Sequence, residues 1–324
     1  MKYLGNKTRL EEFLVGVLTL PQRRNQHALD LFAGTGSVSL LFKKYGLNTT
    51  SNDFLRFAAT RVNAILRDTP PPPNLDLESA TWDGFITNNY SELAGVNIFR
   101  TAVANHIDGA RSLLPAHPTT ADEIYYLAQV IEAADFRSNI MGSYESFYKQ
   151  GWRKQCDKVW ELPSFDLINN YGQTSHQVHD TDARVFLEES DEYYDFIYLD
   201  PPYNNRQYSS VFHVLETIAL GDNPTTAGRV NKREITDDMK SKFSMKRNCV
   251  EEMDSLLSLC AKRTGEVFMS YSSEGIVSIE NLHKLFTKYF ATVTIHQVDY
   301  RRFKTNSHKP TPATVKEVLI HGIK

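Results

Sequence analysis

The chain has 324 residues, of which 41% are hydrophobic and 11% aromatic, and this composition predicts a soluble globular protein with one large core or two smaller ones. The formal net charge of -3 excludes a global basic field, so a nucleic-acid partner would have to bind a local basic face. The three cysteines lack metal-ligand spacing, the N-terminus lacks the apolar core of a signal peptide, and no apolar run is long enough to span a bilayer.

The first nine residues allow two interpretations. Gly5 and Asn6 predict a tight turn before a helix over residues 9–18. The segment is either an ordinary solvated terminus or a lid, in which Tyr3 packs on a ligand and Lys7 reaches an anion. Composition does not choose between them.

The next stretch predicts a strand, a glycine loop and a helix. Residues 28–32 form the strand, residues 33–36 a tight turn, and the helix follows at once. The pattern is not the dinucleotide fingerprint, because the third residue after Gly36 is Ser39, and no Gly-Lys-Ser/Thr of a phosphate loop follows. Asp30 lies inside the strand, and its carboxylate suits a cationic ligand better than a pyrophosphate.

A second strand is predicted over residues 47–53. It ends in Asp53, about 20 residues past the glycine loop, where an acid accepts from ribose hydroxyls in nucleotide-binding βαβ units. The alternative role for Asp53 is to cap a helix that begins at Phe54 and Leu55 and continues from Phe57 to about Leu66.

A proline-rich stretch at 68–74 looks like a junction, and apolar residues then recur at helical spacing as far as about residue 172. Aromatic residues alternate there with Arg and Lys. Such a mixture either contacts a nucleic acid or forms an amphipathic element with core aromatics, and the second is the more common explanation. The residues concerned are Tyr144, Phe147, Tyr148, Lys149, Trp152, Arg153, Lys154, Lys158 and Trp160.

The α/β pattern resumes with a predicted strand at 182–187 and a buried strand at 196–199. The second strand leads directly into Asp200-Pro-Pro-Tyr203. Asp200 is an acceptor carboxylate at a strand end, Pro201 and Pro202 leave free carbonyls, and Tyr203 adds a flat aromatic face. These groups suit a planar molecule with an exocyclic amine, although a rigid turn after a strand explains the same residues.

The remainder predicts helices and strands in alternation, then a hairpin. The helices are expected at 211–220, 250–261 and 279–290, a strand at 266–273, and the antiparallel pair at 291–303 and 314–323. Residues 222–248 read as a polar, mobile loop whose basic side chains could hold a polyanion. The tip of the hairpin is also basic, with Arg301, Arg302, Lys304 and Lys309.

Taken together, these motifs resemble the adenine-specific DNA methyltransferases that use S-adenosylmethionine, in particular the DNA adenine methylase (α-group) family of restriction–modification systems. The matching stretches, in the family's order, are Lys2-Tyr-Leu-Gly-Asn-Lys7, Asp30-Leu-Phe-Ala-Gly-Thr-Gly36, Asn52-Asp53, Asp182 and Asp200-Pro-Pro-Tyr203. The resemblance implies a Rossmann-like α/β catalytic domain (residues 1–74 and 173–324) with a C-terminal antiparallel hairpin. It also implies an inserted, mostly helical target-recognition domain at 75–172.

The resemblance further implies a role for each site residue. Tyr3 and Lys7 would line the cofactor end of the site. The backbone around Phe32, Ala33, Gly34 and Gly36 would hold the methionine part of the cofactor. Asp30 would attract its ammonium, Asp53 its ribose hydroxyls and Asp182 its adenine amine. The Asp182 role departs from the family pattern, because Ala183 follows where relatives often have an aromatic residue.

The implied reaction is methyl transfer to the N6 amine of an adenine rotated out of double-stranded DNA, without a metal. Asp200 and the Pro201 carbonyl would accept from the amine, Pro202 would keep the turn rigid, and Tyr203 would stack on the base. The residues alone do not exclude other methyl acceptors, namely cytosine N4, an RNA adenine or a protein glutamine. They also do not exclude a catalytically dead nucleic-acid-binding module. A cytoplasmic location in a bacterium or archaeon, and a cognate restriction endonuclease that is not a stable subunit, are also implied.

Overall fold

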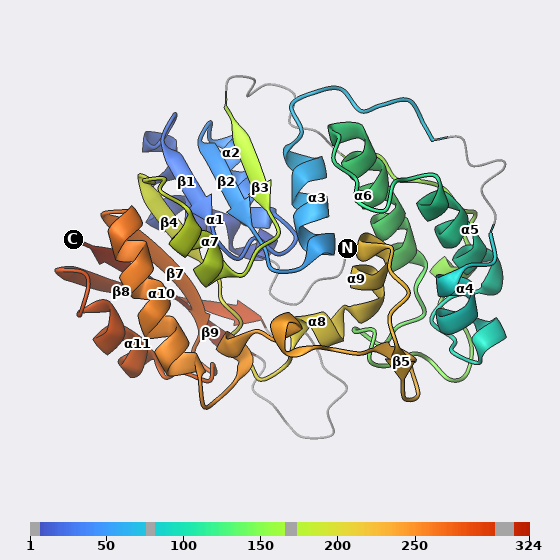
Figure 1. The fold of residues 1–324 in the computed structure, drawn as a ribbon. Coiled ribbons are helices and arrows are strands. Elements are labelled where there is room, and N and C mark those ends of the chain that lie inside the picture. Colours follow the sequence, from blue (N-terminus) through green and yellow to red (C-terminus); the bar gives the residue numbers. More distant parts are fainter. Residues whose placement is uncertain (1–6, 76–81, 166–173, 302–313) are drawn as a thin grey trace.

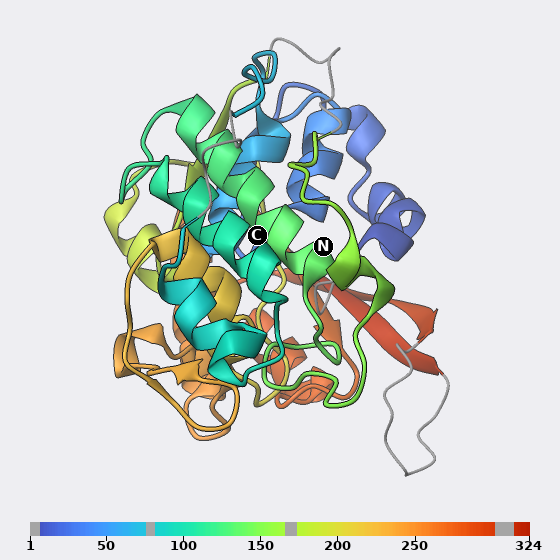
Figure 2. The ribbon, with the colours of Figure 1, turned by 90° about the vertical axis from the view of Figure 1, so that its right-hand side faces the viewer.

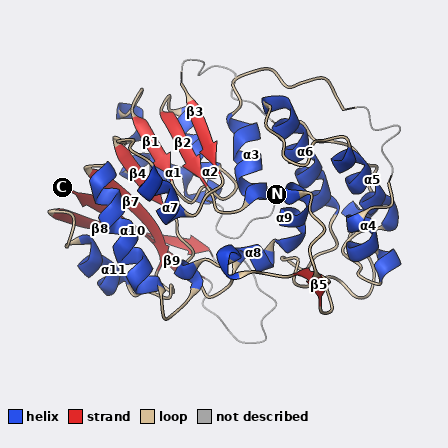
Figure 3. Ribbon diagram, in the orientation of Figure 1, coloured by secondary structure: helices blue, strands red, loops and turns tan. Residues whose placement is uncertain are grey.

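The computed structural model describes residues 7–75, 82–165, 174–301 and 314–324, which form a mixed seven-stranded sheet flanked by helices (Figures 1 and 3). The strand order is β3-β2-β1-β4-β7-β9-β8, with β9 antiparallel to both neighbours and the other pairings parallel. This arrangement confirms the predicted α/β fold with a C-terminal antiparallel hairpin. The strands are β1 (His27–Asp30), β2 (Asn48–Asn52), β3 (His176–His179), β4 (Phe196–Leu199), β7 (Glu266–Ser272), β8 (Thr292–Arg301) and β9 (Thr314–Ile323).

Helices cover both faces of this sheet. One face packs on α1 and α2, and the other on α7, α10 and α11 (Figure 1). Strands buried on both faces are expected to be continuous apolar runs, and all four residues of β4 are buried. The helices are α1 (Glu11–Val17), α2 (Ser37–Lys44), α7 (Ala183–Glu189), α10 (Cys249–Arg263) and α11 (Ile279–Phe286).

The connections create a crevice between β1 and β4. From β1 the chain runs outward to β2 and β3, and it then returns to place β4 on the other side of β1. In open α/β sheets, ligands bind at such a reversal, outside the carboxyl ends of the strands. Asp30 and Asp200 lie at these two carboxyl ends, so the sheet itself brings the two predicted motifs together.

A helical lobe packs beyond the β3 edge, and Figure 2 shows it from its own side. Its core joins residues from three parts of the chain, for example Phe57, Phe99, Ile131 and Leu215. The helices are α3 (Arg56–Leu66), α4 (Phe85–Tyr90), α5 (Thr101–Ser112), α6 (Ala121–Arg137), α8 (Tyr208–Val211) and α9 (His213–Leu220). The predicted insert at 75–172 therefore shares its core with α9, which follows Asp200 in sequence. Its boundaries as a separate domain stay a prediction.

The strand predicted at 182–187 is wrong. These residues begin α7, and Oδ1 of Asp182 accepts hydrogen bonds from the backbone amides of Arg184 (3.0 Å) and Val185 (3.3 Å) as an N-terminal cap. The strand on the outer side of β2 is instead β3, which ends at His179, three residues before Asp182. Because β3 is a short polar edge strand, it lacks the apolar pattern that marks β1 and β4.

The region 222–248 also differs from the prediction of a mobile loop. It contains a small ribbon of β5 (Thr226–Ala227) and β6 (Lys232–Arg233) and two short 3-10 helices, Asp237–Met239 and Lys242–Ser244. Arg233 is buried and pairs with Asp222 at 2.7 Å, whereas Arg229, Lys242, Lys246 and Arg247 are exposed.

The residues of the aromatic and basic segment at 144–160 do not all fit one interpretation, whether nucleic-acid contact or an amphipathic element with core aromatics. Tyr144 and Phe147 are buried core residues, as in an ordinary amphipathic element. Tyr148, Lys149, Lys154 and Lys158 are exposed. Of the predicted basic hairpin tip, Arg302, Lys304 and Lys309 lie outside the described residues. A search of the described helices for one of sufficient length and apolarity to cross a membrane finds none.

Candidate active site

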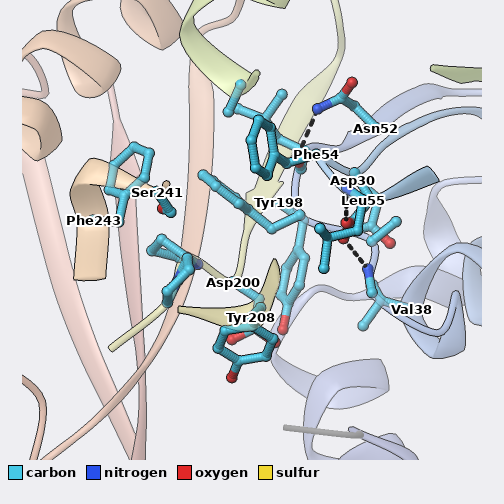
Figure 4. Close-up of a pocket in the computed structure, with 18 of the residues that line it drawn as sticks. Asp30, Val38, Asn52, Phe54, Leu55, Tyr198, Asp200, Tyr208, Ser241 and Phe243 are labelled. Atoms are coloured by element: carbon cyan, nitrogen blue, oxygen red, sulfur yellow. Dashed lines mark hydrogen bonds between the residues drawn. The ribbon is translucent and has the colours of Figure 1, made fainter. Parts of the chain in front are cut away.

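A cavity of about 910 Å³, its opening included, lies at the carboxyl ends of β1 and β4. Figure 4 shows Phe243 and Ser241 on one side of it and Asp30 and Val38 on the other. Most of the predicted site residues line this cavity: Lys7, Asp30, Phe32, Ala33, Gly34, Asp53, Asp182, Asp200, Pro201, Pro202 and Tyr203. Gly36 shapes the adjacent turn without lining the cavity, and Tyr3 lies outside the described residues. The structure thus brings the glycine loop and the Asp-Pro-Pro-Tyr motif to one cavity.

The glycine loop is a left-handed turn that opens α2. Gly34 and Gly36 have φ angles of 53° and 78°, and the Gly36 amide donates to the Ala33 carbonyl at 2.8 Å. A Cβ atom at Gly36 would lie 2.7 Å from Cδ1 of Ile65, so both the backbone conformation and the packing of α3 require glycine there.

We expect Gly36→Ala to destabilise the chain by about 1–3 kcal/mol, because it combines a strained φ with a clash against α3. The matched control is Gly16→Ala in α1, where no atom lies within 4 Å of the added Cβ, so its free energy of unfolding should stay the same or rise. Urea denaturation of both variants measures the difference. Equal stability of the two would contradict this account of the loop.

Asp53 braces the glycine loop from the end of β2. Its Oδ2 accepts from the Gly34 amide at 2.7 Å, and its Oδ1 accepts from the Leu55 amide at 2.9 Å at the start of α3. Burial raises the pKa of Asp53 to about 6, although the two amide bonds oppose this shift. A carboxylate has about four acceptor sites, so these bonds leave capacity for the ribose contact that the sequence predicts.

Asp30 lies deeper in the cavity. Its Oδ2 accepts from the Ser39 hydroxyl at 2.6 Å, and Ser39 in turn accepts from Ser51 at 2.9 Å. Burial raises the pKa of Asp30 to about 7, and the nearby carboxylates of Asp200 and Asp53 add to the shift. The position therefore favours either a proton or a cationic ligand beside Asp30.

Asp200 ends β4 and forms an ion pair that the sequence does not predict. Its Oδ1 lies 3.0 Å from the Nζ atom of Lys7, which also lies 2.7 Å from Oε1 of Glu317 on β9. Burial raises the pKa of Asp200 to about 6, Lys7 lowers it, and Glu317 raises it further. Burial by itself would lower the pKa of Lys7, but Asp200 and Glu317 hold that pKa well above its ordinary value.

Tyr203 is held beside Asp200 by its surroundings. Its ring packs edge-on against Tyr271 with centroids 6.1 Å apart, and its carbonyl accepts from the Ile276 amide at 2.9 Å. The ring lines the cavity and is partly exposed.

Negative charge exceeds positive charge around this cavity. The described lining residues include four carboxylates, Asp30, Asp53, Asp182 and Asp200, but Lys7 as the one Lys or Arg side chain. Burial is the main cause of the raised pKa values of Asp30, Asp53 and Asp200, and only for Asp30 do other lining carboxylates, Asp200 and Asp53, add to it. A ligand with one or two positive charges would balance part of this negative charge.

Sequence reasoning missed other lining residues. Tyr198, Tyr208, Phe54 and Phe243 give the cavity its aromatic walls, and Phe243 packs edge-on against Phe32 with centroids 5.3 Å apart. Tyr198 could have been found, because side chains two residues apart on a strand share a face and Asp200 follows it by two. Phe243 stands in a polar stretch without periodicity and carries no comparable signal.

Proteins of similar sequence include methyltransferases and modification methylases. M.FokI, a type II methyltransferase from Planomicrobium okeanokoites, is 29% identical over 99% of this chain and 52% of its own length. M.NlaIII from Neisseria lactamica is 28% identical over 94% of this chain and 93% of its own length. The modification methylase StsI from Streptococcus sanguinis is 28% identical over 95% of this chain and 49% of its own length. The chain thus spans about half the length of the FokI and StsI proteins.

The match to solved structures is weaker. A SAM-dependent methyltransferase from Agrobacterium tumefaciens aligns over 100% of this chain and 64% of its own, with a TM-score of 0.40 and 12% identity.

A family model described as D12 class N6 adenine-specific DNA methyltransferase matches residues 3–302. Because that match covers most of the 324 residues, the chain belongs to the D12 class of N6 adenine-specific DNA methyltransferases.

Proposed function

We propose that the chain transfers a methyl group from S-adenosylmethionine to the N6 amine of adenine at a specific sequence in double-stranded DNA. The observation that carries this proposal is the shared cavity, in which Asp200-Pro-Pro-Tyr203 faces the glycine loop of Gly34 and Gly36. The M.FokI, StsI and M.NlaIII names support a DNA-modifying role by similarity. Methyl transfer would take place in the cytoplasm of a bacterium or archaeon. A cognate restriction endonuclease would belong to the same system without forming a stable complex with the chain.

The cofactor fits the charge of the cavity. S-Adenosylmethionine carries a sulfonium, an ammonium and one carboxylate, so its net charge is positive, and the cavity offers four carboxylates against one lysine. Asp30 would bind the ammonium, the turn at Ala33 and Gly34 would receive the methionine part with Phe32 beside it, and Asp53 would take the ribose hydroxyls. Asp182 keeps Oδ2 free of hydrogen bonds to the described residues, so this atom can accept from the adenine amine.

The chain's own groups would prepare the target amine. A base rotated out of the duplex would stack on Tyr203, and such stacking contributes about 1–3 kcal/mol toward the cost of leaving the helix. Its amine would donate to Asp200 and to the Pro201 carbonyl, which turns the nitrogen lone pair toward the methyl group. S-Adenosylmethionine would supply that methyl on its sulfonium sulfur: the nitrogen lone pair would form the new N–C bond, the C–S electrons would stay on sulfur, and the amine proton would pass to solvent. Catalysis would rest on positioning and charge complementarity.

Mass analysis of nucleosides tests the proposal. Plasmid DNA from a methylation-deficient host that expresses the chain should contain N6-methyladenine, and plasmid from a host with an empty vector should not. Methylated cytosine in place of methylated adenine, or no methylated nucleoside at all, would overturn the proposed function. Genome-wide detection of the modified adenines would then give the recognition sequence.

Cofactor affinity should depend on pH. The pKa of Asp30 is about 7 without ligand, and a cation binds the ionised carboxylate, so acidification protonates Asp30 and weakens binding. Between about pH 8 and about pH 6 we expect the Kd to rise roughly tenfold, as linkage to one such proton requires. Calorimetry measures this change, and Asp30→Asn should bind more weakly with a flatter pH profile. A wild-type Kd that is constant over this range would contradict the role of Asp30.

A further inference from the structure

A buried chain of charged groups links Asp200 and Lys7, which line the cavity, to Glu317, which does not. The Lys7 ammonium lies between two carboxylates, 3.0 Å from Oδ1 of Asp200 and 2.7 Å from Oε1 of Glu317. The Ser270 hydroxyl donates to the same Oε1 atom at 2.9 Å. The side chain of Lys7 is 5% exposed and that of Glu317 is 10% exposed, so water screens these contacts little.

The sheet fixes these groups relative to one another. Ser270 lies on β7 and Glu317 on β9, where Glu317 pairs with Ser272 across the antiparallel ladder. Lys7 immediately precedes the first helical turn of the chain, so 310 residues separate it from Glu317. Neither motif analysis nor the family match to residues 3–302 includes Glu317.

The Lys7 ammonium forms ion pairs with two carboxylates, those of Asp200 and Glu317. A lysine paired with Asp200 alone could approach both of its oxygens and neutralise the carboxylate that must attract the target amine. Glu317 holds the ammonium at the shorter distance and on the Oδ1 side. The Oδ2 atom of Asp200 makes no hydrogen bond to the described residues, so it stays available to the target amine.

We propose that Glu317 is a positioning residue for methyl transfer: it holds the Lys7 ammonium against Oδ1 of Asp200, so that Asp200 keeps one orientation and presents Oδ2 to the amine. This inference rests on the proposed function, because it concerns the same transfer step. A purely structural ion pair would only join the start of the chain to the C-terminal hairpin. The positioning role predicts a slower transfer step at unchanged cofactor affinity, whereas the structural role predicts lower stability and an unchanged transfer rate in the folded chain.

The expected pH effects have opposite signs for the two partners of Asp200. Glu317 raises the pKa of Asp200 and Lys7 lowers it. Removal of the Glu317 charge should therefore move the acid limb of the rate profile to lower pH, and removal of the Lys7 charge should move it to higher pH. The other titratable groups near Asp200 are Asp30 from β1, Tyr198 from β4 and Tyr208 from α8, and the variants leave them unchanged.

The experiment compares Glu317→Gln and Lys7→Met with the wild-type chain in single-turnover methyl transfer to duplex DNA across pH. For Glu317→Gln we expect the plateau rate to fall roughly 10- to 100-fold, as for a displaced catalytic group. Its acid limb should move down in pH, and its Kd for S-adenosylmethionine should stay within about twofold, since Glu317 lies outside the cavity lining. The acid limb of Lys7→Met should move up.

Two further variants complete the test. Glu266→Gln removes a partly buried, ion-paired carboxylate at the opposite end of β7, beside Arg23 and His321, and should leave the rate unchanged. Ser270→Ala removes the second partner of Glu317, and should lower the rate a few-fold even if Glu317→Gln fails to fold.

A wild-type rate in Glu317→Gln, or an equal loss of rate in Glu266→Gln, would overturn the positioning role. If Glu317→Gln does not fold, a wild-type rate in Ser270→Ala would overturn it. Absence of methyl transfer by the wild-type chain would instead overturn the proposed function, and this inference with it.

Discussion

Asp200→Ala should abolish methyl transfer while cofactor affinity stays nearly intact. Asp200 would be the acceptor that orients the target amine, and removal of one preorganised group of this kind costs roughly 10²–10³-fold or more in rate. The cofactor is expected to bind through the glycine loop, Asp30 and Asp53, which this substitution leaves in place. A radiolabelled methyl assay on mixed DNA measures the rate, and calorimetry measures the Kd for S-adenosylmethionine.

Asp195→Ala is the matched control for this variant. Asp195 lies immediately before the same strand, at its opposite end, where its Oδ2 accepts from the His27 amide at 2.7 Å. We expect this control to retain transfer. An active Asp200→Ala enzyme would refute the catalytic role, and equal loss of activity in both variants would assign the effect to the strand.

Asp53→Ala should weaken cofactor affinity more than any other single change in the cavity. It would remove the ribose acceptor and also the brace on the Gly34 amide, so the loop that receives the cofactor would lose its fixed position. A hydrogen bond to a charged group contributes about 1.5–3 kcal/mol, so we expect the Kd to rise at least roughly tenfold. Calorimetry with S-adenosylmethionine gives this value directly.

The helical lobe contains a matched control for the loss of a bracing carboxylate. Asp108 accepts from the backbone amides of Gly84, Ile86 and Thr87 at 2.8–3.1 Å, much as Asp53 braces the glycine loop. Asp108→Ala should lower the free energy of unfolding without a change in cofactor affinity. Unchanged affinity in Asp53→Ala would remove the cofactor role of Asp53.

Local sequence patterns were sufficient where one short segment carries the whole signal. The predicted strand at 28–32, the glycine turn and the following helix appear as β1, the left-handed turn at Gly34 and Gly36, and α2. The apolar run before Asp200 appears as the buried strand β4. In both cases burial on two faces leaves a mostly apolar sequence, interrupted in β1 by Asp30, that is visible without a partner strand.

Patterns failed where tertiary contacts decide the structure. The segment 182–187 has the apolar content of a strand, but Asp182 caps it as a helix and the polar segment at 176–179 takes the place beside β2. Tyr144 and Phe147 carry the same composition whether they bind a nucleic acid or fill a core, and the packing of the helical lobe places them in its core.

The site residues also differ in whether a local sequence pattern reveals them. Motif spacing predicts Asp30, Asp53 and Asp200, and all three line the cavity. The ion pair between Lys7 and Glu317 joins residues 310 positions apart, on an N-terminal segment and a C-terminal strand, and no local pattern connects them. The second function of Asp53, as the brace for Gly34, likewise needs the packing of β1 beside β2.

The most direct test of the central claim is a crystal structure of the chain with S-adenosylhomocysteine, the demethylated product of the cofactor. The account predicts density between the Ala33–Gly36 turn and Asp200, with the ribose at Asp53 and the sulfur facing the Asp200 side of the cavity. Density at another site, with the cavity between Gly34 and Asp200 filled only by solvent, would contradict it.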